Sequence, residues 1–263
     1  MTESSVQVSI DERGVATVLL NRPERHNAFD ENMIAELTAS FDSLAANEKV
    51  KLMVLRSNGR NFSAGADLDW MKRMANYSHE ENLRDANLLA QMLHKLNYLP
   101  FPTIARVQGA AMGGGAGLVC CCDIAIASDS ASFAFSEAKL GLIPATISPY
   151  VIQSIGAQAA RRYFLTAERF DANTALCLGM VSECMAENQI DEEINKLAQA
   201  ILANSTDAVK AAKQLVFDIE NQEVNPALIE MTSERIAEIR ASEEGKEGLA
   251  AFLEKRKPAW LQG

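Results

Sequence analysis

The sequence predicts an α/β layer architecture for the first part of the chain and a helical region for the last part. Up to about residue 145, short apolar strands alternate with glycine-containing loops and helices. After Pro149 the pattern changes to a series of helices whose outer faces carry Lys and Glu. Strands and helices that alternate in this way usually form one layered domain with its site in loops at one end of the sheet. We expect that arrangement here.

Composition narrows the class of protein. The chain has 263 residues and a formal net charge of −10, with no basic stripe of the kind that nucleic acids require. No apolar run approaches the ~18 residues that suggest a membrane span. The polar start, Met1–Ile10, does not resemble a signal peptide, so we expect a cytoplasmic protein. The five cysteines, three of them adjacent, fit neither a disulfide framework nor a metal site, and small buried apolar residues are the better interpretation.

The N-terminal elements follow from turn and capping residues. Val6–Ile10 and Val15–Leu20 read as two strands joined by a turn that contains glycine. Asp30 is the expected N-cap of a helix that runs to about Ala45. A short apolar strand, Leu52–Leu55, comes next, so the chain begins with two strands, a helix and a further strand.

The middle of the chain repeats strand, loop and helix. A helix is expected from about Leu83 to Leu96, and the residues expected to point inward are Leu88, Leu89, Met92, Leu93 and Leu96. The remaining expected elements are these: a strand at Thr103–Val107, a glycine loop, a short helix ending at Cys122, a strand at Asp123–Ala127 and an edge strand at Ser132–Phe135.

The C-terminal third is expected to be helical and to make subunit contacts. No linker separates it from the rest, so we expect one domain, with residues 1–200 as the α/β core and residues 201–263 as a helical oligomerisation region. The expected helices are Val151–Ile155, Ala157–Leu165, Ala172–Leu178, Ile190–Ala203, Ala208–Glu220, Pro226–Ile239 and Glu243–Lys255.

Met112–Gly117 is a glycine cluster between two apolar runs. It lacks the Lys-Ser/Thr of a P-loop, and Leu118 stands where a dinucleotide-binding motif has its last glycine. A loop that enters a helix N-terminus remains, where free N–H groups favour an anionic oxygen. Close helix–sheet packing explains the glycines equally well.

A second loop, Phe62–Leu68, shifts that balance. It also follows a buried strand and presents backbone N–H groups, for example at Ala66. Two N–H groups from different loops that meet at one carbonyl oxygen form an oxyanion hole. Glu137 lies in an otherwise apolar segment downstream and is the candidate acid/base.

Seven segments in order along the chain resemble motifs of one enzyme family. They are Asn21–Pro23, Asn27–Ala28, Phe62–Leu68, Val107–Gly115, Phe135–Glu137, Leu140–Pro144 and Glu247–Pro258. Together they resemble the crotonase (enoyl-CoA hydratase/isomerase) superfamily over almost the whole chain.

The resemblance implies a crotonase-like core, a superhelix of ββα units, and C-terminal helices that assemble trimers and often hexamers as pairs of trimers. It implies an acyl-CoA thioester substrate, in which coenzyme A is part of the substrate and no other cofactor or metal is needed. The N–H groups of Ala66 and Gly114 would hold the thioester oxygen, and Glu137 would be catalytic. The residues implied to line the path of CoA are Ala28, Ala64, Asp67 and Leu68, with Phe252 and Lys255 from a neighbouring subunit. Trp70 is either pocket wall or core.

At position 117 this chain has glycine, where the best-known hydratases of the family it resembles have a second glutamate. With Glu137 alone, the resemblance leaves two reactions open: a hydratase that works with one carboxylate, or a Δ3-Δ2-enoyl-CoA isomerase. Segments Ser136–Tyr150 and Ala160–Phe170 resemble bacterial methylglutaconyl-CoA and carboxygeranoyl-CoA hydratases, which are similar in having this glycine. We therefore expect a hydratase acting on a branched, carboxylated enoyl-CoA, with 3-methylglutaconyl-CoA of leucine degradation as the first substrate to test.

Two further interpretations stay open at this point. Lys72, Arg73 or Arg84 could pair with a carboxylate on the substrate, although solvated helix charges explain these residues as well. A noncatalytic relative that binds acyl-CoA or RNA is the non-enzyme alternative. The net charge of −10 counts against RNA binding, and the presence of Glu137 counts against a protein without catalytic activity.

Overall fold

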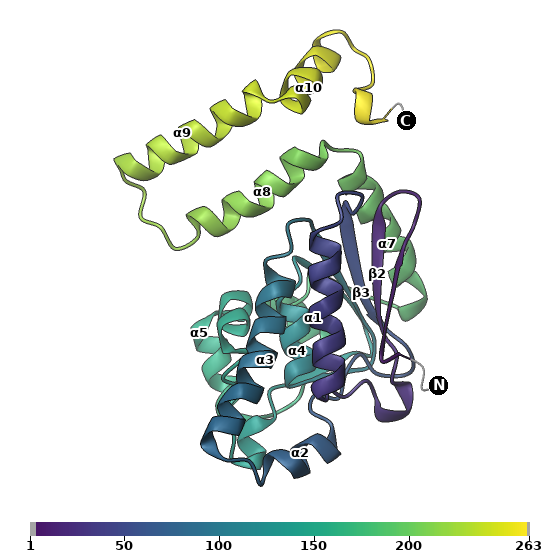
Figure 1. The fold of residues 1–263 in the computed structure, drawn as a ribbon, viewed down its shortest axis with the longest axis vertical. Helices are drawn as coiled ribbons and strands as arrows, with labels where there is room; N and C mark the ends of the chain where they lie inside the picture. Colours follow the sequence, from purple (N-terminus) through teal and green to yellow (C-terminus); the bar gives the residue numbers. More distant parts are fainter. Residues whose placement is uncertain (1–3, 262–263) are drawn as a thin grey trace.

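The computed structural model describes residues 4–261, which form a six-stranded sheet, a small three-stranded sheet and the helices around them (Figure 1). The strands are β1 (Val6–Ile10), β2 (Val15–Leu20), β3 (Leu52–Ser57), β4 (Thr103–Val107), β5 (Ala110–Met112), β6 (Ile124–Ser128), β7 (Ser132–Ala134), β8 (Phe170–Asp171) and β9 (Glu183–Met185). The large sheet has the order β1-β2-β3-β4-β6-β9 and the small one β5-β7-β8. The predicted α/β architecture is confirmed.

Within the described residues, ten α-helices cover these sheets and extend beyond them. They are α1 (Glu31–Ala45), α2 (Leu68–Met74), α3 (His79–Asn97), α4 (Gly114–Cys120), α5 (Ser148–Thr166), α6 (Ala172–Leu178), α7 (Glu187–Leu202), α8 (Thr206–Ile219), α9 (Pro226–Ala241) and α10 (Glu243–Leu253). Among residues 4–261, no helix is both long and apolar enough to cross a membrane.

The large sheet places two loops at the same edge. β1 and β2 form the predicted antiparallel hairpin, while β2, β3, β4, β6 and β9 run parallel to one another. The carboxyl ends of parallel strands meet at one edge of a sheet. Phe62–Leu68, which follows β3, and the glycine cluster, which follows β4 and β5, therefore leave the sheet on the same side.

Helices α1 and α3 show how capping and periodicity set the helical layer. The Asp30 side chain accepts a hydrogen bond from the Met33 N–H, which confirms it as the N-cap of α1. Helix α3 begins at His79, earlier than expected, because Ser78 and Glu81 form a capping box. The prediction for Leu88 was wrong: its side chain is 53% exposed, since the buried residues of α3 all lie C-terminal to it, from Met92 to Asn97.

Three strands were not predicted, and one helical break was. Strands β5, β8 and β9 have only two or three residues, too few for an alternating pattern to stand out. The expected division of α5 is confirmed, because Gly156 has a φ of 74° and interrupts the helical backbone. Helix α10 ends at Leu253, two residues earlier than expected, and Lys255 then adopts a φ of 54°.

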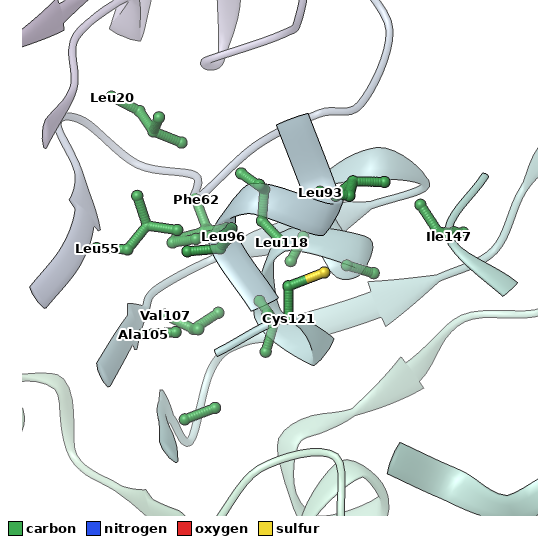
Figure 2. Close-up of a cluster of buried hydrophobic side chains, with 14 of the residues drawn as sticks. Leu20, Leu55, Phe62, Leu93, Leu96, Ala105, Val107, Leu118, Cys121 and Ile147 are labelled. Carbon is green, nitrogen blue, oxygen red and sulfur yellow. The ribbon is translucent and has the colours of Figure 1, made fainter. Parts of the chain in front are cut away.

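The main core contains the side chains that hold the glycine-rich segments in place. Figure 2 shows this buried cluster, in which Leu118 of α4 and Cys121, the residue after that helix, meet Leu93 and Leu96 of α3. Burial raises the pKa of the Cys120 thiol to about 12, so this group stays protonated and packs as an apolar residue. The same interpretation fails for Cys177, which is exposed.

The C-terminal helices have little core of their own. Helices α8 and α9 contain no buried residue, and α10 contains only Ala251. Helix α8 is tied to the core by Lys213, whose ammonium lies 2.8 Å from Asp123 Oδ2 and donates to the Phe101 carbonyl at 3.0 Å. A cavity of about 620 Å³ remains between α8 and the core. In Figure 1, α8, α9 and α10 extend away from the sheets.

Candidate active site

The two loops that leave the sheet edge lie against each other. The Ser63 N–H donates to the Ala110 carbonyl at 3.0 Å, and the Met112 N–H donates to the Ser63 carbonyl at 2.9 Å. Gly65 has a φ of 87°, and a Cβ there would lie 2.9 Å from the Met112 carbonyl oxygen. Only glycine allows both this conformation and this approach. The two loops are therefore neighbours, and the oxyanion hole that their N–H groups would form stays a prediction.

Phe29 fixes the position of both predicted oxyanion-hole residues. Its N–H donates to the Gly65 carbonyl and its carbonyl accepts from the Asp67 N–H, each at 2.7 Å, so that Ala66 lies between two anchored residues. The Phe29 ring also lies 2.8 Å from the place of a Cβ on Gly114. Within residues 4–261, neither the Ala66 N–H nor the Gly114 N–H donates a hydrogen bond. Two unused donors are therefore positioned by one residue, Ala66 through the backbone of Phe29 and Gly114 through its ring.

Glu137 approaches the same glycine cluster from the small sheet. The Gly113 N–H donates to Ala134, the last residue of β7, at 2.8 Å, which brings the following short 3-10 helix, Glu137–Leu140, close to the cluster. Glu137 Oε1 lies 2.9 Å from the place of a Cβ on Gly113, whose φ is 50°. Any side chain at Gly113 would therefore displace the carboxylate.

The Glu137 carboxylate is left without a full set of partners. Its Oε2 atom is buried and has no hydrogen-bond partner among the described residues. Burial raises the pKa of Glu137, and a hydrogen bond to its own backbone only partly offsets this rise. A buried acceptor without a partner is costly, so such a group usually has a functional reason. The arrangement combines one acid/base with free N–H donors, which suits proton transfer next to a developing oxyanion.

Comparison with known proteins places this geometry in a family. The profile of the family described as Enoyl-CoA hydratase/isomerase matches residues 11–263. The chain belongs to the enoyl-CoA hydratase/isomerase family. It is an enoyl-CoA hydratase-like enzyme that acts on acyl-CoA thioesters, and its fold is the crotonase fold.

Individual relatives agree with this assignment. The chain is 48% identical to the crystal structure of an enoyl-CoA hydratase from Shewanella pealeana, with a TM-score of 0.94 over 97% of this chain and 96% of that one. It is 33% identical to an enoyl-CoA hydratase from Mycobacterium smegmatis, with a TM-score of 0.93 over 99% and 100% of the two chains. The short-chain-enoyl-CoA hydratase of Clostridium acetobutylicum is 31% identical over 245 residues, which cover 92% of each chain.

The residues expected to line the CoA path differ in accessibility. Ala64 and Leu68 are exposed, Leu68 by 69%, and lie on the outside of the first loop. Ala28 and Asp67 are buried. The Asp67 carboxylate caps α2 by accepting from the Asp69 N–H at 2.8 Å, and it lies 3.4 Å from the Arg22 guanidinium. Its contacts within the chain position the loop, and contact of these four residues with CoA stays a prediction.

Trp70 is 3% exposed and packs in the main core, where its Nε1–H donates to Asp85 Oδ1 at 3.2 Å. Burial raises the pKa of Asp85, and the bond from Trp70 opposes that rise. This contact holds α2 against α3 beside the first loop. Trp70 thus belongs to the core, and contact between it and the acyl group stays a prediction.

Phe252 and Lys255 lie far from the glycine cluster within one chain. Both are exposed, Phe252 by 80%, and they lie at the end of α10. Figure 1 shows α10 and α2 at opposite ends of the molecule. The fold therefore does not bring these two residues to Glu137 in a single chain, and contact with CoA from a neighbouring subunit stays a prediction.

Two contributors to the site were missed at the level of sequence. Phe29 directly follows the Asn27–Ala28 motif and was not singled out, although it positions Ala66 and Gly114 together. Ile147 read as part of a family-like run, yet its side chain fills the space above Gly117. The sequence showed only that both residues are apolar and therefore able to be buried. Their contacts join segments 30 or more residues apart, and such contacts leave no local pattern.

Proposed function

We propose that the protein is a hydratase that adds water across the α,β double bond of an enoyl-CoA and uses Glu137 as its single acid/base. The observation that carries this proposal is the buried, unpartnered Oε2 of Glu137 beside two unused backbone donors. A water molecule or a substrate carbon acid would supply the missing partner.

The proposed reaction follows from the positions of these groups. The thioester oxygen accepts hydrogen bonds from the N–H groups of Ala66 and Gly114. Glu137 removes a proton from water, the hydroxide oxygen forms a bond to Cβ, and the π electrons move to form an enolate. Glu137 then returns the same proton to Cα, so the overall reaction adds H and OH to the same face. The two N–H donors stabilise the enolate oxygen more than the neutral thioester, which lowers the barrier.

The raised pKa of Glu137 suits this double role. A carboxylate works best as both base and acid when its pKa is closer to the working pH. Burial moves the pKa of Glu137 in that direction. Below this pKa the carboxyl is protonated and cannot activate water, so kcat/KM is expected to fall on the acidic side.

The second candidate is a Δ3-Δ2-enoyl-CoA isomerase. It is favoured by the same single carboxylate, because moving a proton between two carbons needs only one acid/base. The N–H groups of Ala66 and Gly114 would stabilise the same dienolate oxygen. The reactions differ in whether water enters the product.

We propose a branched, carboxylated acyl group, with 3-methylglutaconyl-CoA of leucine degradation as the leading candidate. Three cations near α2 and α3 could receive the second carboxylate. Lys72 is paired with Asp69 at 2.9 Å, and Arg73 is paired with Glu31. Arg84 is exposed and forms no ion pair within residues 4–261, so it is the cation best able to accept a substrate carboxylate.

We further propose that α8, α9 and α10 assemble the protein into a trimer or into a hexamer made of two trimers. In this assembly Phe252 and Lys255 reach the CoA of a neighbouring subunit. Support comes from the shortage of buried residues in these helices and from the 80% exposure of Phe252. Coenzyme A enters as part of the substrate. A cytoplasmic location stays a prediction.

One assay separates the candidates. Purified protein is given 2-enoyl-CoA and 3-enoyl-CoA esters of straight, branched and carboxylated acids, and the products are separated by mass. We expect 3-hydroxyacyl-CoA from the 2-enoyl esters, fastest with the branched, carboxylated ester. Conversion of 3-enoyl to 2-enoyl esters without any gain of water would favour the isomerase instead. Arg84→Gln is expected to lower kcat/KM for the carboxylated ester only.

A further inference from the structure

Two glycines at the start of α4, Gly113 and Gly117, are each covered by a different side chain. Gly113 and Gly117 are one helical turn apart and are joined by a hydrogen bond from the Gly117 N–H to the Gly113 carbonyl at 3.0 Å. Glu137 Oε1 lies over Gly113. A Cβ on Gly117 would lie 2.3 Å from Ile147 Cγ2 and 2.9 Å from Ile147 Cβ. The carboxylate and the isoleucine thus cover two glycines that are four residues apart and joined by this hydrogen bond.

Ile147 is firmly held in this place. It is 2% exposed and joins the main core, and Leu93 Cδ2 lies 3.8 Å from the same Cβ position on Gly117. Figure 2 shows Ile147 and Leu93 at one end of the buried cluster. Ile147 is also β-branched, so its side chain has few alternative rotamers. A side chain at residue 117 would therefore clash with Ile147, which has no free space into which it could rotate.

We propose that Ile147 is a positioning residue that fills the place of a second acid/base and keeps Glu137 the only titratable side chain at the reacting carbons. This inference rests on the proposed function, in which Glu137 moves the proton. The pair formed by Gly117 and Ile147 is reciprocal: a carboxylate can enter at residue 117 only if the side chain at residue 147 is removed. Ile147 also excludes bulk water from the side of Glu137 that faces α4.

The steric part is tested first by thermal unfolding, which needs no activity. Gly117→Glu is expected to lower the Tm strongly, because buried overlap and an unpaired buried charge both destabilise. Adding Ile147→Gly should restore much of that Tm, although Ile147→Gly alone lowers it by leaving a cavity. Such non-additivity shows that the two positions share one space. Gly117→Ala, which adds only a Cβ, is the matched control and should also lower the Tm. An unchanged Tm in Gly117→Ala would overturn the inference.

The catalytic part is tested by the pH dependence of kcat/KM for hydration. Ile147→Gly should move the acidic limb to lower pH, since water that enters beside Glu137 reduces the desolvation that raises its pKa. No charged side chain contributes to that shift, so relief of burial is the expected cause. The double variant Gly117→Glu/Ile147→Gly should show a second ionisation and at least a tenfold higher rate than Gly117→Glu alone.

The outcomes distinguish this inference from the proposed function. If Glu137→Gln retains wild-type hydration, both fail. If Glu137→Gln is inactive while Ile147→Gly keeps the wild-type pH profile, only the role of Ile147 fails. A double variant with a single ionisation, like that of the wild type, would likewise overturn the role of Ile147 and leave that of Glu137 intact.

Discussion

The glycine-loop end of the core and the C-terminal helices are stabilised in opposite ways. At the loop end, backbone hydrogen bonds and glycine contacts hold the two loops together, while within residues 4–261 two N–H donors stay unused and one buried carboxylate oxygen has no partner. In α8 and α9 no residue is buried, and apolar side chains such as Phe252 of α10 face outward. In the first region the side chains are closely packed, but polar groups still lack hydrogen-bond partners among residues 4–261. In the second region the backbone is bonded within the helices, but apolar side chains still lack a surface to pack against.

This difference indicates what each region still needs. A buried polar atom without a partner is satisfied by a small polar ligand or water. An exposed apolar face is satisfied by another apolar surface. Substitutions at the loop end should therefore change turnover without changing assembly. Substitutions in the C-terminal helices should change assembly, and they should change turnover only through the CoA contacts proposed for Phe252 and Lys255.

The largest expected effect is that of Glu137→Gln. The amide keeps the shape of the side chain but cannot accept and return a proton, so kcat should fall by about 10²–10⁴. Acyl-CoA binding, measured by calorimetry, and the mass of the particle should stay as in the wild type. Near-normal turnover would remove Glu137 from the mechanism.

Ala66→Pro should have the next largest effect. Proline removes the backbone N–H of a residue whose N–H donates no hydrogen bond within residues 4–261, so little structural bonding is lost. Loss of one oxyanion-hole donor typically costs about 10²–10³ in kcat. Ala66→Gly keeps the N–H and serves as the control. Equal kcat values for the two variants would show that this donor has no catalytic role.

Phe252→Asp tests the second region. If another subunit covers this side chain, its burial contributes about 1.5–3 kcal/mol, and the substitution should weaken assembly roughly 10–100-fold. Val8→Asp, at a β1 side chain that is 44% exposed, is the matched control and should assemble normally. Analytical ultracentrifugation over a range of concentrations makes the comparison. Identical masses for both variants would mean that α10 contacts no partner at this residue.

The smallest effect compares two helix caps. Asp30 caps α1 and also lies 2.7 Å from the Arg22 guanidinium, with both side chains 17% exposed. Asn225 caps α9 with a bond from the Leu228 N–H and is exposed. Each replacement by alanine should cost about 1 kcal/mol through the lost cap, and Asp30→Ala somewhat more because Arg22 loses its partner. Urea unfolding measures both. A larger cost at Asn225 would contradict the contrast between the regions.

The sequence predicted those parts of the molecule that local chemistry determines. The N-cap at Asp30, the break at Gly156 and five strands of the large sheet, β1, β2, β3, β4 and β6, follow from neighbouring residues, because capping, φ and periodicity act over a few positions. Strands β5, β8 and β9 were missed because two or three residues carry no periodicity, and they pair only with distant partners.

In the candidate site, too, the residues in local motifs could be predicted, and the contacts between distant segments could not. Its glycines and Glu137 were visible as motifs, and their convergence at one sheet edge followed from the parallel strands. The contact of Ile147 with Gly117 could not be predicted, because it depends on how the segment after Glu137 folds back over α4. The unpartnered Oε2 of Glu137 is likewise a property of the folded chain.

The most direct test of a single acid/base is the stereochemistry of hydration in deuterated water. If Glu137 alone takes the proton from water and returns it, the deuterium at Cα and the oxygen at Cβ must enter from the same face. Nuclear magnetic resonance of the 3-hydroxyacyl product reads the relative configuration at these two carbons. The proposed mechanism predicts a syn product and none with the Glu137→Gln variant. An anti product would require a second proton donor on the opposite face and would contradict it.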